Sequence, residues 1–291
     1  MKIVIFGKQF DPKQTPYVQQ LFDVLHRKGA QVCVYKSYYN LIKSHIKFAE
    51  KPGVFSQSKD IENLDFLFSI GGDGTLLDAV PYIHDFGVPI LGINLGRLGF
   101  LSSVSRLEMK KAIDYIYAGN YSLGQRTLLK LEKPGNLFGK LNFALNDLTI
   151  YRNNDTSLVT IHVYINGLFL NTYWGDGLII ATPTGSTAYS MSVGGPILTP
   201  GSENFVIAPI ASHNLTVRPI VIQDSSEIRI KIEGREEKYL LSLDSRQRQI
   251  NKTEEIIIKK CNFRINLVQM PEQNFFSTIR EKLLWGVDSR N

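Results

Sequence analysis

Short apolar runs alternate with stretches of helical periodicity through the first third of the chain. The apolar runs predict buried strands at residues 2–6, 31–35, 65–70 and 89–93. Between them, residues 15–28 and 107–118 place apolar side chains at the spacing of one helix face, and Gly29 and Gly119 follow as stop signals. Strands separated by helices predict a parallel sheet covered on both faces, with ligands binding beyond the carboxyl ends of its strands.

The pattern changes near Tyr121, where short runs of β-branched and aromatic residues begin to follow one another. They predict strands at 127–131, 141–151, 158–165, 168–173, 178–181, 227–232, 239–243 and 255–260. Turn signals such as Asn166-Gly167 separate them and favour antiparallel pairing. The polar segment 182–195 interrupts this β region, and residues 275–285 are helix-like again. We therefore expect domains at 1–122 and 123–272, and a C-terminal segment at 273–291 that packs on the first domain.

Composition narrows the class of protein. The chain has 291 residues, 43% of them apolar, and a formal net charge of +6. This charge is spread along the chain, which argues against a partner nucleic acid and suits a small anionic substrate, although an ordinary solvated surface explains it as well. No apolar stretch approaches the ~18 residues of a membrane span, and the N-terminal run is too short for a signal peptide. Cys33 and Cys261 are expected as buried free thiols, so we expect a cytoplasmic protein without a membrane partner.

The residues Gly71-Gly-Asp-Gly-Thr75 follow directly on the apolar run that ends at Ile70. Glycines allow a tight turn whose N–H groups approach a ligand, and a helix N-terminus just beyond favours phosphate. Asp73 would repel such a ligand unless it holds a cation or accepts a proton. The alternative is a plain turn in which Asp73 caps the next helix. No Gly-Lys-Ser/Thr follows, so this is not a Walker A loop.

Three further segments carry polar groups suited to binding. Asp176–Pro196 is a short apolar run followed by a loop dense with hydroxyls, which can bind sugar hydroxyls, base edges or phosphate oxygens. Asn94–Phe100 contains one cation, Arg97, between glycines and is expected at the same sheet edge as the glycine loop. Asn146-Asp147 places an amide beside a carboxylate, which suits an adenine edge and a ribose hydroxyl, or equally a turn or bulge.

These motifs stand in the order found in NAD kinases, and the chain resembles that family over nearly its whole length. The segments that carry the resemblance are Gly71–Thr75, Asn94–Leu101, Asn146-Asp147, Asp176–Pro196, Ser212-His213, Arg218–Ile220, Leu243–Ser245 and Phe275–Trp285. The first motif also occurs in diacylglycerol, sphingosine and phosphofructo-kinases, whereas Asp176–Pro196 is much more specific.

The resemblance implies a fold and a reaction. The fold is a Rossmann-like α/β domain followed by a β-sandwich domain, with a C-terminal segment returning to the first. The reaction moves the γ-phosphate of ATP to the 2′-hydroxyl of the adenosine ribose of NAD, giving NADP, with a divalent metal that is expected to be Mg²⁺ arriving with ATP. None of the five histidines stands at zinc-ligand spacing, and no residues are assigned as a metal site.

The resemblance also implies roles for individual residues. Asp73 is the proton acceptor for the ribose hydroxyl, Gly74 lines the same loop, and Asp176 reaches the nicotinamide side, often from a neighbouring subunit. A homodimer or homotetramer is therefore expected. The residues expected to hold the adenosine part of NAD are Asn146, Asp147, Thr187, Ala188, Tyr189, Ser190 and Ser192. The residues expected at the phosphates are Gly71, Gly72, Thr75 and Arg97.

The chain departs from the family pattern at three positions. Asp147 stands where the family usually has Glu, which shortens the reach of that carboxylate. Arg246 replaces a usual Gln, so that contact is not carried over, and Trp174 stands where an Arg is often found. Two other functions share part of the evidence: a lipid kinase with the same glycine loop, and a non-enzymatic NAD sensor. The first would need a membrane-facing basic amphipathic segment, which the sequence lacks, and the second gains nothing from Asp73.

Overall fold

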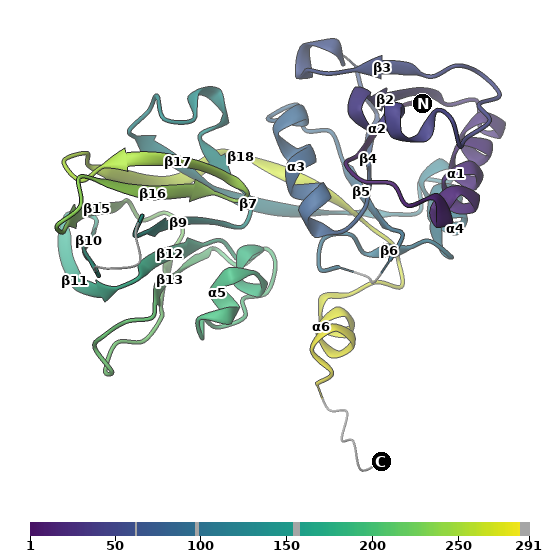
Figure 1. Cartoon of the computed structure of the whole chain (residues 1–291). Coiled ribbons are helices and arrows are strands. Elements are labelled where there is room, and N and C mark those ends of the chain that lie inside the picture. Colours follow the sequence, from purple (N-terminus) through teal and green to yellow (C-terminus); the bar gives the residue numbers. More distant parts are fainter. Residues whose placement is uncertain (62, 97–98, 154–157, 286–291) are drawn as a thin grey trace. The chain divides into compact units, whose positions relative to one another are not determined.

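The computed structural model describes residues 1–61, 63–96, 99–153 and 158–285 (Figure 1). The chain divides into two compact units, which are described separately. Unit 1 comprises residues 1–125 and 265–291, and unit 2 comprises residues 126–264. Two long strands, β7 (Ser122–Lys133) and β18 (Ile256–Gln269), carry the chain from one unit into the other.

Unit 1 is built on a parallel sheet with strand order β3-β2-β1-β4-β5. Its strands are β1 (Lys2–Gly7), β2 (Gln31–Tyr35), β3 (Gly53–Phe55), β4 (Phe66–Ile70) and β5 (Ile90–Asn94). The short β6 (Val104–Ser105) and the end of β18 both pair with β5. Every residue of β4 and β5 is buried, which is the expected state of central strands covered on both faces.

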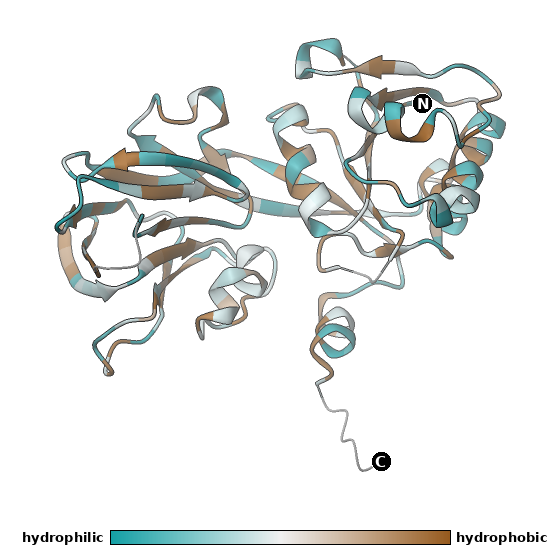
Figure 2. Cartoon of the chain, viewed as in Figure 1, coloured by the Kyte–Doolittle hydropathy of each residue, from teal (hydrophilic) through white to brown (hydrophobic). Residues whose placement is uncertain are grey.

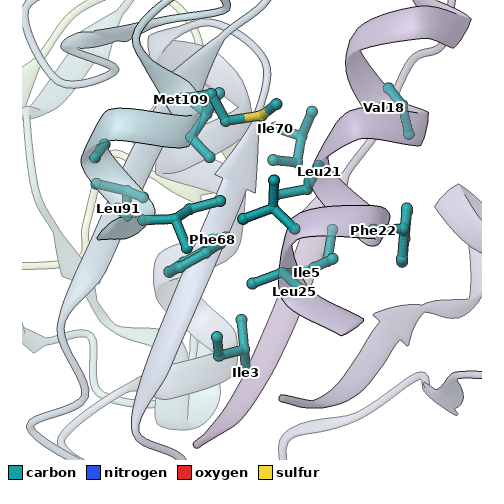
Figure 3. Close-up of a cluster of buried hydrophobic side chains, with 14 of the residues drawn as sticks. Ile3, Ile5, Val18, Leu21, Phe22, Leu25, Phe68, Ile70, Leu91 and Met109 are labelled. Atoms are coloured by element: carbon teal, nitrogen blue, oxygen red, sulfur yellow. The ribbon is translucent and has the colours of Figure 1, made fainter. Parts of the chain in front are cut away.

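Helices cover this sheet and complete its core. They are α1 (Thr15–Arg27), α2 (Lys36–Ile42), α3 (Asp73–Ile83) and α4 (Met109–Tyr117). Helix α6 (Phe275–Leu283) follows β18 in the sequence and buries one residue, Ile279. Figure 3 shows Leu21 and Leu25 of α1 packed toward Phe68 of β4, with Met109 of α4 in the same cluster. The periodicity of residues 15–28 and 107–118 therefore identified both helices on this face of the sheet.

Helix α2 and the short strands β3 and β6 of unit 1 lie outside the sequence expectations. Helix α2 is short and contains Ser, Tyr and Asn, which are weak helix formers. It forms because Tyr38 and Ile42, one turn apart, are both fully buried. Strand β3 is a three-residue edge strand in which only Phe55 is buried, so no apolar run announces it.

Unit 2 is a β-sandwich. One sheet has the order β14-β13-β12-β9-β16-β17, and the facing sheet pairs β11, β10, β15 and β18, with β7 pairing both β18 and β8. The strands are β8 (Phe143–Ala144), β9 (Asp147–Tyr151), β10 (Val159–Ile165), β11 (Leu168–Gly175), β12 (Gly177–Ala181), β13 (Asn204–Ile210), β14 (Ile220–Gln223), β15 (Ile228–Glu233), β16 (Lys238–Leu243) and β17 (Arg246–Asn251). One core cluster contains residues of both sheets, among them Ile150 and Ile180 from the first and Ile161 and Ile230 from the second.

Several strand predictions in unit 2 were incomplete. The run at 141–151, expected as one strand, is two, because the chain leaves the ladder at Leu145-Asn146 between β8 and β9. Strand β13 is buried from Phe205 to Ile210 but contains Pro209, which argues against an inner strand. Strand β17 carries one buried residue, Ile250, and Figure 2 shows it mostly hydrophilic, in contrast to β12. An edge strand of this composition has no apolar alternation to reveal it.

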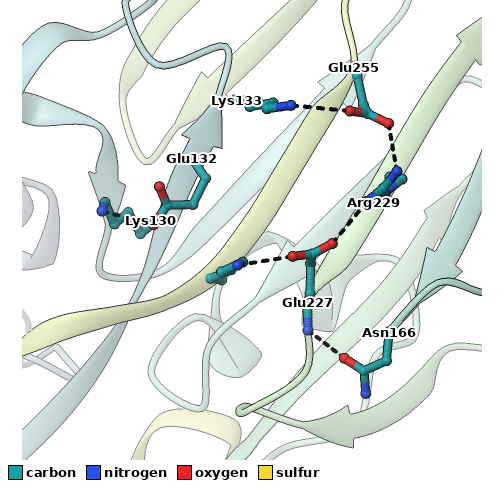
Figure 4. Close-up of polar contacts among 8 residues, drawn as sticks. Lys130, Glu132, Lys133, Asn166, Glu227, Arg229 and Glu255 are labelled. Carbon is teal, nitrogen blue, oxygen red and sulfur yellow. Dashed lines mark hydrogen bonds and ion pairs between the residues drawn. The ribbon is translucent and has the colours of Figure 1, made fainter.

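A chain of ion pairs crosses the outer surface of the second sheet (Figure 4). Arg229 of β15 contacts Glu227 at 3.3 Å and Glu255 at 3.1 Å, and these carboxylates also contact Lys259 and Lys133. The network joins β15, β18 and β7. Such a connected set contributes more to stability than isolated surface pairs do.

Two expectations concern the environment of the chain. Cys33 and Cys261 are both free; Cys261 is buried as expected, but Cys33 is only partly buried, because β2 lies between β1 and the three-residue β3 near the edge of the sheet. Among the described residues, no helix is long and apolar enough to cross a membrane.

Candidate active site

The glycine loop joins the end of β4 to the start of α3. Gly71 has φ +146°, a conformation open to glycine alone, and a side chain there would overlap Thr75 Oγ1. Gly72 precedes the helix, and α3 begins at Asp73. The helix therefore begins at the carboxyl end of β4, where an anion-binding loop would place its first N–H groups. In this turn the Thr75 N–H already donates to the Gly72 carbonyl at 2.9 Å.

Asp73 does not cap its own helix. Its carboxylate accepts three backbone N–H bonds from a loop further along the chain: Oδ2 from Phe100 at 2.8 Å, and Oδ1 from Leu101 at 3.0 Å and Ser102 at 2.8 Å. The alternative of Asp73 as an N-cap is therefore wrong. A carboxylate has about four acceptor positions, so the bonds from described residues leave one acceptor position, on Oδ2.

Two glycines make this arrangement possible. A side chain at Gly99 would overlap the Asp73 carboxylate. A side chain at Gly92 of β5 would come within 2.6 Å of Ser102 Cα and 2.9 Å of the Leu101 carbonyl oxygen. The loop therefore lies in close contact with both the strand and the carboxylate, and its main chain determines where Asp73 points.

A cavity of about 640 Å³ opens at the carboxyl ends of β1, β4 and β5. Its lining includes Gly71, Gly72 and Thr75 of the glycine loop, together with Lys8, which follows β1 directly. Lys8 Nζ lies 2.6 Å from Asp78 Oδ2 on α3, which holds the cation beside the loop. The predicted cation Arg97 lies outside the described residues.

Asn146 and Asp147 stand where the chain enters β9 in unit 2. The carboxylate of Asp244 accepts the backbone N–H of Leu145 at 2.9 Å, of Asn146 at 2.7 Å and of Asp147 at 3.3 Å. Asp244 occupies the tight turn between β16 and β17 with φ +52°, a conformation that Asp tolerates better than most residues. This buried carboxylate fixes the main chain of the predicted pair.

The side chains of the pair have different surroundings. Asn146 Oδ1 is buried and has no hydrogen-bond partner among the described residues, so it offers an acceptor for a ligand. Asp147 is 8% exposed and accepts a 3.0 Å bond from Thr149 Oγ1. Burial, together with the neighbouring charge of Asp244, raises the pKa of Asp147 to about 7. Asp147 therefore changes protonation near neutral pH.

The hydroxyl-rich loop after β12 is joined to Asn146. The Thr182 N–H donates to the Asn146 carbonyl at 2.9 Å, and Thr182 Oγ1 donates to the Leu145 carbonyl at 2.6 Å. A side chain at Gly185 would overlap the Asn146 carbonyl. The structure thus brings Asn146 and Asp147 together with the loop that carries residues 187–192.

Within that loop the predicted residues differ in exposure. Thr187 and Ala188 are partly buried, Tyr189 is 47% exposed and Ser192 is exposed, so all four have surface that a ligand can contact. Ser190 is fully buried, and its hydroxyl has no partner among the described residues. A side chain at Gly195 would overlap Ser190 Oγ, so this serine lies on the inner side of the loop.

Asp176 lies apart from this cluster. It precedes β12, whereas Thr182 follows it, and at about 3.3 Å per residue the strand separates them by roughly 20 Å. Asp176 Oδ1 pairs with Arg152 Nε at 3.2 Å. Beside it, the ring of Trp174 packs against His213 with 4.8 Å between ring centroids. Within one chain, Asp176 therefore belongs to the opposite end of β12.

Several residues of this site were missed or left without a role in the sequence analysis. Lys8 follows β1, so its place at the carboxyl end of a parallel strand was an available signal. Asp244 stands in the segment Leu243–Ser245 that carries the family resemblance, but it was given no role. The donors to Asp73 are main-chain N–H groups, which no residue type reveals. Arg246 has a structural contact: its guanidinium donates to the Leu141 and Phe143 carbonyls and so joins β17 to the segment before β9.

Among residues 1–61, 63–96, 99–153 and 158–285, no three or more His, Cys, Asp or Glu side chains gather as a metal site would require. The cavity beside the glycine loop is instead lined by that loop and by Lys8, and backbone N–H groups and lysine are ligands for phosphate oxygens. The lining also includes Asp11, whose carboxylate accepts the Lys13 N–H at 2.9 Å. A metal that arrives already bound to a polyphosphate fits this set of groups.

Comparisons with known proteins complete this description. Residues 3–121 match the ATP-NAD kinase N-terminal domain, and residues 145–270 match the ATP-NAD kinase C-terminal domain. An NAD kinase of Cytophaga hutchinsonii is 43% identical and one of Flavobacterium psychrophilum is 45% identical, each over 100% of both chains. The crystal structure of yeast NADH kinase complexed with NADH has a TM-score of 0.87 and 28% identity, covering 99% of this chain and 88% of that one. An NAD kinase from Archaeoglobus fulgidus in complex with ATP shares the fold at 23% identity, with a TM-score of 0.76 over 98% of this chain and 99% of that one.

Proposed function

The chain belongs to the ATP-NAD kinase family, and from that membership we propose a role for each residue of the site. The enzyme is a phosphotransferase that phosphorylates NAD with ATP to give NADP. The family, activity and fold class expected from the motifs are confirmed. The matched family acts on NAD, so a lipid acceptor and a non-enzymatic sensor are set aside.

Asp73 accepts the proton of the ribose 2′-hydroxyl as the new bond to phosphorus forms. The observation that supports this role is the carboxylate itself, which is held by three main-chain N–H bonds yet retains one acceptor position on Oδ2. A ribose hydroxyl is a weak nucleophile near neutral pH, and a positioned base typically accelerates such a step by about 10²–10⁴-fold. Oδ2 is the oxygen that takes the proton, because Oδ1 already accepts two bonds.

The cavity beside the glycine loop holds the phosphates of ATP. The N–H groups of Gly72 and Gly74 at the start of α3 bind phosphate oxygens together with the Thr75 hydroxyl, and Lys8 neutralises the phosphate charge. Phosphoryl transfer depends mainly on alignment and on such neutralisation. ATP enters with a divalent cation, Mg²⁺ by preference, which the phosphates and water hold. Arg97 adds a second cation in this proposal.

Unit 2 recognises the adenosine part of NAD. Asn146 Oδ1, an acceptor without a partner among the described residues, accepts from the adenine amino group. Asp147 binds a ribose hydroxyl, and Tyr189 offers an exposed ring for stacking against the base. Thr187, Ala188 and Ser192 contact base and ribose, whereas the buried Ser190 shapes the loop from within.

Asp176 serves a neighbouring subunit. Its separation from Thr182 by the length of β12 supports this assignment, since one chain does not bring Asp176 to the adenosine cluster. The active form is then a homodimer or homotetramer, in which Asp176 binds on the nicotinamide side. The two free cysteines support a cytoplasmic location, where thiols stay reduced.

Replacing Asp73 by Asn tests the central assignment. We expect kcat for NADP formation to fall by about 10²–10⁴-fold, while the Kd for NAD, measured by calorimetry, stays within threefold. Asp85→Asn is the matched control, because this carboxylate lies just after the same helix and is exposed. Turnover of Asp73→Asn equal to that of the control would refute Asp73 as the proton acceptor.

Asparagine also replaces one of the two oxygens that accept the three N–H bonds by an NH₂ group. The position of the Phe100–Ser102 loop must therefore be measured separately. Hydrogen exchange of the Phe100–Ser102 amides serves this purpose. A loss of turnover with unchanged exchange assigns the effect to the missing base. Faster exchange would instead assign it to a displaced loop, and Asp73→Glu would then be needed to separate the two.

A further inference from the structure

We propose that Gln273 is a positioning residue for catalysis: it binds Ser103 from the C-terminal segment and thereby keeps the Phe100–Ser102 amides aligned on Asp73. The proposal rests on the assignment of Asp73 as proton acceptor. All residues involved lie in unit 1.

Gln273 holds Ser103 by two bonds. Its Nε2 donates to the Ser103 carbonyl at 2.7 Å, and its Oε1 accepts from Ser103 Oγ at 3.1 Å. Both residues are partly buried, so water competes only partly for these groups. The contact joins positions separated by 170 residues, and it binds main chain as well as side chain at Ser103.

Ser103 is the next residue after the last donor to Asp73. The Ser102 N–H donates to Asp73 Oδ1, and the Ser102 carbonyl accepts the Gly99 N–H at 3.1 Å, which closes the turn. The chain then enters β6 at Val104, which pairs with Ile93 of β5. The Ser103 carbonyl lies in the Ser103–Val104 peptide plane, so the bond from Gln273 fixes the chain where it leaves the turn. Together with the bond from Ser103 Oγ, it restricts rotation of the residue next to Ser102, and so helps to hold the Ser102 N–H toward Asp73.

The surroundings explain why two hydrogen bonds matter here. A cavity of about 620 Å³ lies between α4 and α6, and its lining includes Gly99, Ser103 and Gln273. On this side the loop faces open space, so hydrogen bonds to Gln273 take the place of close packing. Gln273 is itself ordered by its own turn, since its N–H donates to the Met270 carbonyl at 3.0 Å.

The same turn provides a matched control. Glu272 pairs with Lys111 of α4 at 2.8 Å, and both side chains are more than half exposed. Such a surface pair contributes little to stability. Glu272→Gln therefore perturbs the turn without touching Ser103. Gln273→Met keeps the length of the side chain and removes both hydrogen bonds to Ser103, together with the longer 3.4 Å bond from the Met270 N–H to Gln273 Oε1.

The experiment measures steady-state NADP formation and hydrogen exchange of the 99–103 segment in the full-length enzyme. For Gln273→Met we expect kcat to fall on the order of tenfold, because small misplacements of reacting groups are costly. KM for NAD and for ATP should stay within twofold, and the segment should exchange several times faster. Ser103→Ala, which removes one of the two bonds, should show a smaller loss, and Glu272→Gln should match wild type.

The double variant Asp73→Asn with Gln273→Met decides whether Gln273 acts through Asp73. We expect no loss beyond that of Asp73→Asn alone. If Gln273→Met lowers kcat by the same factor on the Asp73→Asn background as on the wild type, the proposal is overturned. Normal kcat and normal hydrogen exchange in Gln273→Met would also overturn it. Normal turnover of Asp73→Asn would instead overturn the assignment of Asp73. If Gln273→Met does not fold, Ser103→Ala carries the same comparison.

Discussion

The carboxylate of Asp244 accepts the backbone N–H of Asn146 at 2.7 Å, across 98 positions of sequence. Asp244→Asn replaces an acceptor oxygen by a donor and leaves at least one buried N–H unpaired. We expect the free energy of unfolding to fall by about 1–3 kcal/mol. KM for NAD should rise as well, because the main chain of Asn146 is no longer fixed. Thermal unfolding and initial rates measure the two effects.

Asp224→Asn is the control for this variant. Asp224 is also a buried carboxylate of unit 2, 3% exposed, and it pairs with Lys260 at 2.7 Å. Its replacement should lower stability and leave KM for NAD unchanged. If both variants lower stability without changing KM, Asp244 has no part in placing Asn146 for the ligand.

Lys8 is expected to bind the phosphates of ATP. Lys8→Met removes the charge and keeps much of the side-chain length, so KM for ATP should rise by about tenfold, the value of one charge-assisted hydrogen bond. KM for NAD should not change. Lys13→Met, at an exposed lysine five positions on, should affect neither constant. Equal increases for both substrates would show that Lys8 supports the fold of the loop rather than ATP binding.

Asp147 makes stability depend on pH. Burial and the charge of Asp244 raise its pKa to about 7 in the folded chain, against about 3.9 for an ordinary Asp. The folded state therefore holds this proton more tightly, and the resulting stability is present below about pH 4 and lost as pH rises through about 7. Relative to Asp147→Asn, the free energy of unfolding of the wild type should fall on the order of a few kcal/mol as the pH rises from about 4 to above 7.

Urea unfolding of both proteins at pH 5 and pH 8 measures this difference. Asp114→Asn is a useful comparison, since the hydrogen bond from Lys28 lowers the pKa of this exposed carboxyl. Its contribution is already complete at pH 5 and should not change up to pH 8. A constant difference between wild type and Asp147→Asn would mean that Asp147 is ionised throughout this range.

Arg229 joins Glu227 and Glu255 in the surface network of unit 2 (Figure 4). Arg229→Met should lower the free energy of unfolding by about 1 kcal/mol at low salt. The loss should shrink in 1 M NaCl, where exposed charges are screened within about 3 Å. Lys252→Met, which breaks an isolated pair with Glu237, should cost less. A loss independent of salt would point to packing of the arginine stem.

Local patterns revealed the framework but not the contacts that complete the site. The apolar run before Gly71 placed Asp73 correctly at a sheet edge, because a strand, a glycine turn and a helix start are all local signals. The residues that orient Asp73 come 27 to 29 positions later and act through main-chain N–H groups. Gln273 is 170 positions from Ser103, and nothing in the sequence around a glutamine in a polar turn indicates which residue it binds. Pro209 hid an inner strand, because its fixed ring argues against a ladder position that tertiary packing nevertheless allows.

The close approach of Gly99 to Asp73 has a consequence for how this enzyme tolerates sequence change. Because backbone amides orient the carboxylate, a saturation library at position 100 should return many active clones with varied side chains. The same library at position 99 should return glycine alone, since even the methyl group of alanine would overlap the Asp73 carboxylate. Two neighbouring positions would then differ sharply in the substitutions they tolerate. The difference would show that position 99 must lack a side chain so that the Asp73 carboxylate can lie against the main chain.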